Sequence, residues 1–375
     1  MKKKIITTSW HKGGANAIIP IIKRLKEERK LDILALGHGY SEDIFNSKDI
    51  DYKTIQDFGL NNVSKESMQT ILERENVNLV LTGTSVQDDK NKDVIEQTIT
   101  LAAKERGIPT LAILDFWANY SIRFSDIYNN QKFKFLPDRI AIIDEFAEKE
   151  MLDEGFSKNI LIITGNPHFD DLERKSREFT KEKKQDIEKK IKLNHNLWVF
   201  YTANKWKTEK DNLNCWGLDI IKLISESLNN EAGLIVKLHY SAYNNYSKDL
   251  EELIEYVNQH PKGRIIVPNI EQHELILASD LILTPFSTTA IEAVYMERPC
   301  ISLQPGLKGI DYLSMLTHNG IIPVGYTIDD CRTLIQKAIK DKEYRKKLLK
   351  NTSSFKTDGK ATERVVSLIY QMIGV

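Results

Sequence analysis

A turn of small hydroxyl residues, between a short apolar run and a helix, is the part of this sequence best suited to chemistry. The apolar run is Leu281–Leu283, and the turn contains Ser287, Thr288 and Thr289. Glu292 lies one turn into the helix that follows. A helix N-terminus presents unpaired backbone N–H groups and a positive dipole end, which favour a phosphate group, and a nearby carboxylate can accept hydrogen bonds from ribose or sugar hydroxyls. The alternative is an ordinary capped helix, because serine and threonine are common helix caps.

Three further polar residues are candidates for the same nucleotide site. His239 follows the predicted strand Gly233–Leu238, where an imidazole can donate a hydrogen bond to a phosphate oxygen. Asn204 follows the predicted strand Leu197–Thr202 and could add an amide group to that pocket. His273 lies in the run Gln272-His273-Glu274, which begins a predicted helix and could cover a base or a ribose. For each histidine the alternative is a ring whose hydrogen bonds are satisfied within the protein.

A second group of candidates lies near the N-terminus. Gly13 and Gly14 follow the predicted strand Lys4–Thr8, and glycine lets the backbone approach a ligand closely. A tight turn explains the pair equally well, and the absence of G-x-G-x-x-G argues against a dinucleotide fingerprint. His11 could act as a general base or bind acceptor hydroxyls, and a surface histidine is the alternative.

The loop after the predicted strand Thr110–Leu114 combines groups that suit a sugar. It contains Asp115, Trp117, Asn119 and Arg123. An indole offers a flat apolar face to a pyranose, and carboxylate and amide groups bind its hydroxyls. Asp115 is a second candidate for the base that takes the acceptor proton. The alternative is a buried aromatic anchor beside a capping aspartate.

Strand-like and helix-like stretches alternate through the whole chain, which predicts parallel sheets covered by helices. A chain of 375 residues suits two domains of roughly 150–200 residues each. We expect an N-terminal Rossmann-like domain over residues 1–165 and a C-terminal one over 166–355, facing each other across a cleft. Ligands bind beyond the carboxyl ends of such strands, which predicts the site in that cleft. The charge-rich residues 173–192 are interpreted as a solvated helix leading into the second domain.

Composition excludes several classes of protein. Lys and Arg together number 53, as do Asp and Glu, so the zero formal charge indicates no nucleic-acid partner. The three cysteines lack C-x-x-C spacing, so a disulfide framework or a zinc site is not expected and a reducing cytoplasm fits. No run of 18 apolar residues occurs, which leaves only a peripheral membrane contact open. Motifs of P-loop NTPases, esterases and metalloproteases are absent.

Three stretches resemble the GT-B glycosyltransferases. The branch they resemble includes the non-hydrolysing UDP-N-acetylglucosamine 2-epimerases, lipid A disaccharide synthase and the glycerophosphotransferases of wall teichoic acid. The stretches are Pro137–Asp170, Val236–His239 and Ser287–Ala293 with Arg298-Pro299. The resemblance implies the GT-B fold, with donor phosphates held by His239 and Ser287–Thr289, the acceptor in the N-terminal domain, and the helix in 356–375 crossing back onto that domain. The epimerase's early Arg-Pro-Glu is replaced by Trp10-His11-Lys12, which argues against an epimerase.

We therefore expect a glycosyltransferase that moves a sugar from a nucleotide-activated donor to a carbohydrate or lipid-linked acceptor in surface polysaccharide or glycoconjugate biosynthesis. We expect a cytoplasmic location and neither a metal ion nor another cofactor, the nucleotide sugar being a substrate. One alternative keeps the fold and makes the protein a sugar-nucleotide 2-epimerase or a glycerol-phosphate transferase. The other is a binding module that has lost catalysis.

Overall fold

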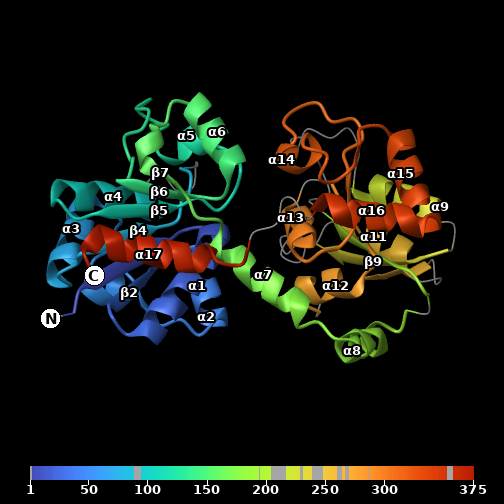
Figure 1. The fold of residues 1–375 in the computed structure, drawn as a ribbon, viewed down its shortest axis with the longest axis horizontal. Helices are drawn as coiled ribbons and strands as arrows, with labels where there is room; N and C mark the ends of the chain where they lie inside the picture. Colours follow the sequence, from blue (N-terminus) through green and yellow to red (C-terminus); the bar gives the residue numbers. More distant parts are fainter. Residues whose placement is uncertain are drawn as a thin grey trace. The chain divides into compact units, whose positions relative to one another are not determined.

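The structure is a computed structural model that divides into two compact units. It describes residues 2–87, 94–193, 195–203, 217–228, 231–238, 248–259, 264–266, 270–285, 287–352 and 358–375. Unit 1 consists of Met1–Asp171 and Thr357–Val375, and unit 2 consists of Leu172–Lys356. Each unit contains one parallel sheet with helices packed on it (Figure 1). The mixed α/β class predicted from the sequence is therefore confirmed.

The sheet of unit 1 has seven parallel strands in the order β3-β2-β1-β4-β5-β6-β7. The strands are β1 (Lys4–Ser9), β2 (Asp32–Gly37), β3 (Tyr52–Lys53), β4 (Leu79–Thr82), β5 (Thr110–Ile113), β6 (Arg139–Ile142) and β7 (Leu161–Ile163). The order turns back after β1, so β1 and β4 are neighbours at the centre of the sheet. The loops that follow these two strands consequently emerge side by side at the carboxyl edge.

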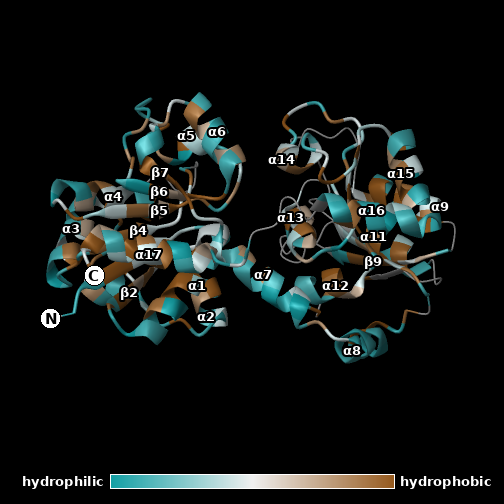
Figure 2. Ribbon diagram, in the orientation of Figure 1, coloured by the Kyte–Doolittle hydropathy of each residue, from teal (hydrophilic) through white to brown (hydrophobic). Residues whose placement is uncertain are grey.

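Helices cover both faces of this sheet. The α-helices of the unit are α1 (Lys12–Glu28), α2 (Tyr40–Ser47), α3 (Lys65–Arg74), α4 (Ile95–Glu105), α5 (Tyr120–Arg123), α6 (Glu145–Asp153), the start of α7 (Pro167–Arg177) and α17 (Ala361–Ile373). Successive residues of β1 point to opposite faces, as a strand requires. Ile5 packs with α1 and α17, whereas Ile6 packs with α3 and α4. The apolar strands consequently lie inside the unit (Figure 2).

The sheet of unit 2 has six parallel strands in the order β10-β9-β8-β11-β12-β13. The strands are β8 (Trp198–Ala203), β9 (Gly233–Leu238), β10 (Arg264–Ile266), β11 (Leu281–Thr284), β12 (Cys300–Leu303) and β13 (Val324–Gly325). The α-helices are α8 (Lys181–Ile191), α9 (Gly217–Leu228), α11 (Lys248–Gln259), α12 (Gln272–Ala278), α13 (Thr288–Tyr295), α14 (Ser314–Thr317), α15 (Ile328–Lys340) and α16 (Lys342–Thr352). Ile221 of α9 and Ile335 of α15 join one buried cluster on this sheet.

Two sequence-based expectations about helices are corrected. The charged stretch 173–192 forms two helices, α7 and α8, because Thr180 interrupts it and caps α8 by accepting a hydrogen bond from Lys183 N–H. The sequence pattern also predicts a helix over residues 16–29, after the two glycines, whereas α1 begins at Lys12, so Gly13 and Gly14 belong to its first turn. The first correction replaces one expected helix by two. The second places the glycines inside a helix instead of in the turn before it.

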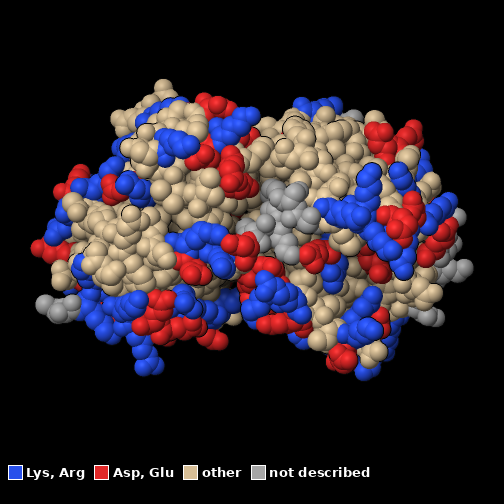
Figure 3. Space-filling view, viewed as in Figure 1, with Lys and Arg blue, Asp and Glu red and all other residues tan. Residues whose placement is uncertain are grey.

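The surface charge is mixed, and none of the described helices has what a membrane span requires. Lys and Arg side chains alternate with Asp and Glu side chains over the face drawn in Figure 3, in line with the zero formal charge. Within the described residues, no helix combines the length and the apolar character needed to cross a bilayer.

The C-terminal helix α17 is anchored in unit 1. It packs along α1 (Figure 1), and Asp170 of α7 accepts hydrogen bonds from the backbone N–H groups of Ala361 at 3.1 Å and Thr362 at 2.7 Å. These N–H groups belong to the first turn of α17 and have no partner within the helix. The aspartate therefore caps a helix that lies 191 residues away in the chain.

We expect Asp170→Ala to lower the free energy of unfolding by about 1–2 kcal/mol, the usual loss for a helix cap. Urea unfolding followed by circular dichroism measures the change. Asp153→Ala, at an exposed position of α6, is the control. Equal stability of the two variants would show that the α17 cap contributes nothing.

Candidate functional site

The start of α13 gathers hydroxyl groups at the carboxyl end of β11. Ser287 has an extended backbone, and its Oγ accepts a hydrogen bond from Thr289 N–H at 3.3 Å. The hydroxyl oxygens of these two residues lie 3.0 Å apart. Thr288, between them, is exposed. The positive end of the helix dipole and two side-chain hydroxyls therefore occupy one position, which suits an anionic group.

Glu292 lies one turn further along α13 and is fixed by α12. Gln272 Nε2 donates hydrogen bonds to Glu292 Oε2 at 2.6 Å and to Thr289 Oγ1 at 3.1 Å. The Glu292 residue is 8% exposed. One amide group thus ties the carboxylate to the hydroxyl cluster at the helix start.

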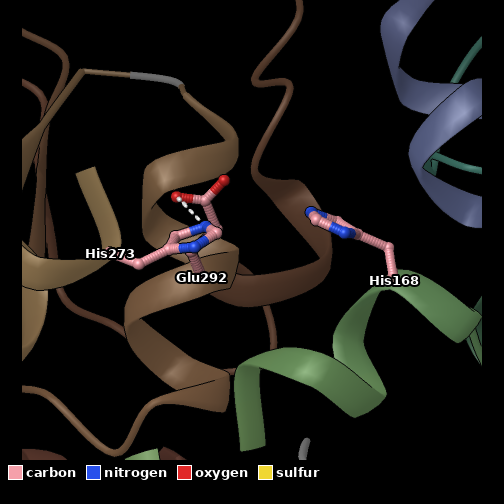
Figure 4. A group of neighbouring side chains, drawn as sticks. All are labelled: His168, His273 and Glu292. Carbon is pink, nitrogen blue, oxygen red and sulfur yellow. Dashed lines mark ion pairs between the residues drawn. The ribbon is translucent and has the colours of Figure 1, made fainter. Parts of the chain in front are cut away.

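His273 provides a second contact to this carboxylate. Its Nε2 lies 3.8 Å from Glu292 Oε2, the pair joined by a dashed line in Figure 4, which also draws His168 of unit 1. Lys175 Nζ lies 2.9 Å from His273 Nδ1. Because an ammonium group can only donate, Nδ1 accepts in this contact and Nε2 carries the ring proton that faces the carboxylate.

Lys237, the penultimate residue of β9, is a cation close to this group. Its Nζ donates a hydrogen bond to Ile270 O at 2.7 Å. Burial lowers the pKa of the ammonium group, while the negative charges of Glu271 and Glu292 act in the opposite direction. The neighbourhood of Glu292 therefore contains a partly desolvated positive charge, whose interactions are stronger than those of an exposed lysine.

Unit 1 has a separate group of polar residues, at the carboxyl ends of β1, β4 and β5. Asp115 follows β5, and its Oδ1 accepts from Arg123 Nη1 at 2.9 Å. A Cβ atom on Gly13 would lie 2.1 Å from Asp115 Oδ2. The absence of a side chain at Gly13 therefore leaves room for the Asp115 carboxylate at the start of α1, and a larger residue there would displace it.

Glu96 connects the loops after β1 and β4. Its Oε1 accepts hydrogen bonds from the Trp10 N–H at 2.8 Å and from the Ser85 hydroxyl. Glu96 is 3% exposed, and its Oε2 is buried without a hydrogen-bond partner. Burial raises the pKa of the Glu96 carboxyl, against the hydrogen bonds from Ser85 and Trp10, which lower it. Burial thus makes the charged form of Glu96 costlier than it would be in water, while two hydrogen bonds to Oε1 offset part of that cost.

Comparison with protein families places the chain. The model of the family described as CDP-glycerol:poly(glycerophosphate) glycerophosphotransferase matches residues 147–371, which is more than half of the chain. The chain belongs to this family. The match includes all of unit 2 and therefore Ser287, Glu292 and their neighbours. No curated protein sequence matches this glycerophosphotransferase-family member at a significant level.

Solved structures similar to this family member share its fold. S. aureus MnaA in complex with UDP has a TM-score of 0.71 and 18% identity over 99% of this chain and 97% of its own. UDP-GlcNAc 2-epimerase from Neisseria meningitidis bound to UDP-GlcNAc has a TM-score of 0.71 and 17% identity, over 98% of this chain and 100% of its own. A glycosyltransferase from Rickettsia africae has a TM-score of 0.67 and 14% identity, over 99% of both chains. The expected GT-B fold and its branch are thus confirmed.

The structure brings some of the predicted site residues together. Ser287, Thr289, Glu292 and His273 form one contiguous group in unit 2. Their roles in binding a donor stay predictions, as does that of the exposed Thr288. His239 and Asn204 were predicted for the same site and lie outside the described residues.

The N-terminal candidates separate into different environments. Gly13 lies against Asp115, whereas Gly14 is buried, where a Cβ would lie 2.4 Å from Ser9 Oγ. Asn119 is exposed and adopts a left-handed backbone with φ of 60° as the N-cap of α5. The ring of His11 stacks on that of Tyr40, with centroids 6.2 Å apart.

Two of the predicted acceptor contacts are corrected. Trp117 is 4% exposed, donates a hydrogen bond to Asp144 Oδ2 at 2.8 Å and stacks on Phe169, so its face is not available to a sugar. Arg123 donates to Thr84 O, Thr84 Oγ1 and Ala118 O besides Asp115. Its side chain is 10% exposed, so it positions Asp115 instead of reaching an acceptor directly.

Lys237, Ser85 and Glu96 were not predicted as site residues. Ser85 follows a predicted strand, a position where polar residues are candidates. Gln272 was predicted only together with His273, at a helix start that could cover a base or a ribose, and its hydrogen bond to Glu292 was not predicted. Glu96 gave no local signal, because a glutamate near the start of a helix normally faces water.

We expect Glu96→Gln to change how stability depends on pH. Above the ordinary pKa of 4.5 the unfolded chain releases a proton that native Glu96 retains, so wild-type stability falls as pH rises toward the native pKa. Glutamine has no such proton. The variant should therefore gain stability relative to wild type between pH 5 and pH 8.

Urea unfolding across that pH range provides the measurement. Glu105→Gln, on the exposed surface of the same helix, is the control. A difference between Glu96→Gln and wild type that stays constant with pH would exclude a native carboxyl with a raised pKa.

Proposed function

We propose that this protein is a transferase that moves a group from a nucleotide-activated donor to a hydroxyl group of a carbohydrate or lipid-linked acceptor, in the biosynthesis of a surface polysaccharide or glycoconjugate. The observation that carries the proposal is the start of α13, where Ser287 and Thr289 lie beside Glu292. A phosphate group at this helix end and hydroxyls at the carboxylate are the features that one nucleotide would present together. Membership of a family described by a CDP-linked donor supports the same substrate class.

The donor half of the reaction depends on stabilising the leaving nucleotide. Negative charge accumulates on its phosphate oxygens as the bond breaks, and preorganised N–H groups, hydroxyls and cations lower that barrier. The α13 start would supply N–H and hydroxyl groups, and Lys237 would supply a positive charge. We propose that His239 adds a further donor and that His273 orients Glu292 toward a ribose.

The family match favours a polyol phosphate as the transferred group. In that reaction the acceptor oxygen bonds to the phosphorus that carries the polyol. The bond between this phosphorus and the oxygen that bridges the two phosphates breaks, and a nucleoside monophosphate leaves with the bridging oxygen. Sugar transfer, the expectation from the sequence, is the second candidate. There the acceptor oxygen bonds to the anomeric carbon and a nucleoside diphosphate leaves. The fold shared with a structure bound to UDP-GlcNAc supports this candidate.

The acceptor half is proposed to use unit 1. Asp115 lies at the carboxyl end of β5, held by Arg123 and adjacent to the bare backbone of Gly13. Either this carboxylate or His11 would take the proton that the acceptor hydroxyl loses. Asn119 would bind acceptor hydroxyls.

No metal ion or other cofactor is included in this proposal. The N-terminus of α13, its hydroxyls and Lys237 would neutralise the donor phosphates, a task that magnesium performs in many nucleotide enzymes.

Products distinguish the candidate reactions. We expect incubation with CDP-glycerol and an acceptor fraction to release CMP, measured by ion-exchange chromatography. Release of UDP from UDP-GlcNAc with an acceptor would instead identify sugar transfer, and conversion of UDP-GlcNAc alone without nucleotide release would identify an epimerase. Turnover should persist in excess EDTA, and its loss there would contradict metal independence. Nucleotide binding without turnover of any donor would favour the binding module.

We expect Glu292→Gln to weaken nucleotide binding about tenfold, because an amide replaces one hydrogen-bond acceptor with a donor. A thermal-shift series with CMP, CDP, UDP, GDP and dTDP measures binding, and a nucleotide held only by the native state raises the melting temperature by several degrees. Glu231→Gln, at an exposed position before β9, is the matched control. An unchanged shift in Glu292→Gln would remove the carboxylate from the site.

A further inference from the structure

Four aromatic rings gather at the carboxyl ends of β1 and β2 in unit 1. The centroid of the Trp10 ring lies 5.0 Å from that of His38 and 6.1 Å from that of Tyr40. The rings of His11 and Tyr40 are nearly parallel, with an interplanar angle of 13°. Tyr40 is 49% exposed, and the other three are half-buried. We refer to Trp10, His11, His38 and Tyr40 as the aromatic platform.

The loops that carry the platform are fixed from below. Glu96 binds the N–H group of Trp10. Gly39 has φ of +64°, and a Cβ there would lie 2.6 Å from the Trp10 ring, so the ring packs on a bare backbone. Ser41 Oγ donates to His38 O at 3.0 Å and accepts from His38 N–H at 3.1 Å. The rings are therefore held in place before any ligand arrives, which reduces the entropy that binding costs.

The position of the platform is that of a ligand site. Ligands of open parallel sheets bind beyond the carboxyl ends of the strands. The platform occupies this edge at β1 and β2, and His11 immediately precedes α1, whose first turn contains Gly13 beside Asp115. Tyr40 packs against the rings of Trp10 and His11, so part of one continuous aromatic surface reaches water at this edge.

The chemistry of the platform favours a neutral ring with an apolar face. Burial lowers the pKa of His38, so this imidazole is uncharged at neutral pH. Aromatic faces bind the C–H groups of a sugar ring, while imidazole nitrogens and the phenol can bind its hydroxyls. A phosphate-rich ligand would require a cluster of fixed positive charges, which these four side chains do not provide.

We propose that the aromatic platform binds a sugar ring of the acceptor, with Tyr40 and Trp10 contacting its apolar face. This inference rests on the proposed function, because only a transferase has an acceptor. It specifies that the acceptor is a carbohydrate. The platform takes the role that the sequence suggested for Trp117, whose ring is buried.

Ligand-observed NMR tests the inference without requiring turnover. The probes are the methyl glycosides of glucose, galactose and N-acetylglucosamine added to the full-length protein. Saturation transfer to their ring protons should be seen with wild type and with Tyr40→Phe, which keeps the aromatic face. It should be lost in Tyr40→Ala, whose exposed position makes a folding defect easy to exclude by circular dichroism.

The control is Tyr128→Ala, because Tyr128 is 43% exposed and lies in the loop between α5 and β6. In assays with an acceptor, Tyr40→Ala should raise the acceptor KM about tenfold and leave the donor KM unchanged. Two NMR results would contradict the platform. One is equal saturation transfer to a glycoside from Tyr40→Ala and from wild type, and the other is no saturation transfer to any of the glycosides.

Failure of the platform is distinguishable from failure of the proposed function. If the protein binds a nucleotide and turns over a donor but shows no saturation transfer to any glycoside, the platform is refuted and the proposed function stands. Glycoside binding that depends on Tyr40, in a protein that binds no nucleotide, would refute the proposed transferase and leave the platform as a carbohydrate site.

Discussion

The buried carboxyl of Glu96 is the constraint on which the organisation of unit 1 depends. One oxygen receives the Trp10 N–H from the loop after β1 and the Ser85 hydroxyl from the loop after β4. These strands are neighbours in the sheet, but their pairing does not determine the direction in which their loops leave the sheet. The hydrogen bonds of Glu96 to both loops fix that direction. A side chain whose own burial is unfavourable is maintained there because it satisfies polar groups of two loops at once.

Unit 2 also has a glutamate on the helix after a central strand, but its carboxylate has different contacts. Glu292, like Glu96, lies on a helix that follows a central strand, but Gln272 and His273 both contact its carboxylate. Such contacts make an ionised carboxylate less costly and orient its remaining lone pairs. The carboxyl of unit 1 therefore ties two loops together, whereas the carboxylate of unit 2 is oriented by two side chains, as the proposed contact with ribose hydroxyls requires. Similar folds need not place their working residues at equivalent positions, because side chains, not topology, set the chemistry.

The sequence predicted the longer strands well because buried parallel strands are short apolar runs between breakers. It did not predict β3 or β13, which have two residues each and so show no apolar run. It also did not predict α2 or α16, whose patterns are weak because few of their side chains are buried. The link between Ser287 and Glu292 was predictable, since one helix carries both. The contribution of Gln272 was not, because it arrives from another element. Trp117 illustrates the same limit. The sequence is equally compatible with an exposed indole that binds a sugar and with a buried indole that anchors the loop, and only its packing on Phe169 decides for the buried one.

The two units also differ in how much the family membership explains. The match begins at residue 147 and thus includes unit 2 but little of the sheet of unit 1. Phosphate and ribose are common to all nucleotide donors, so a site for them can be shared across a family. An acceptor can differ from one transferase to the next, so a site for it need not be shared. The loop Trp10-His11-Lys12, with Tyr40 beside it, lies outside the residues that the family model matches, so its chemistry is derived from its own side chains. These side chains form an aromatic surface whose backbone is held by a buried carboxyl, and an apolar sugar face is the complement of such a surface.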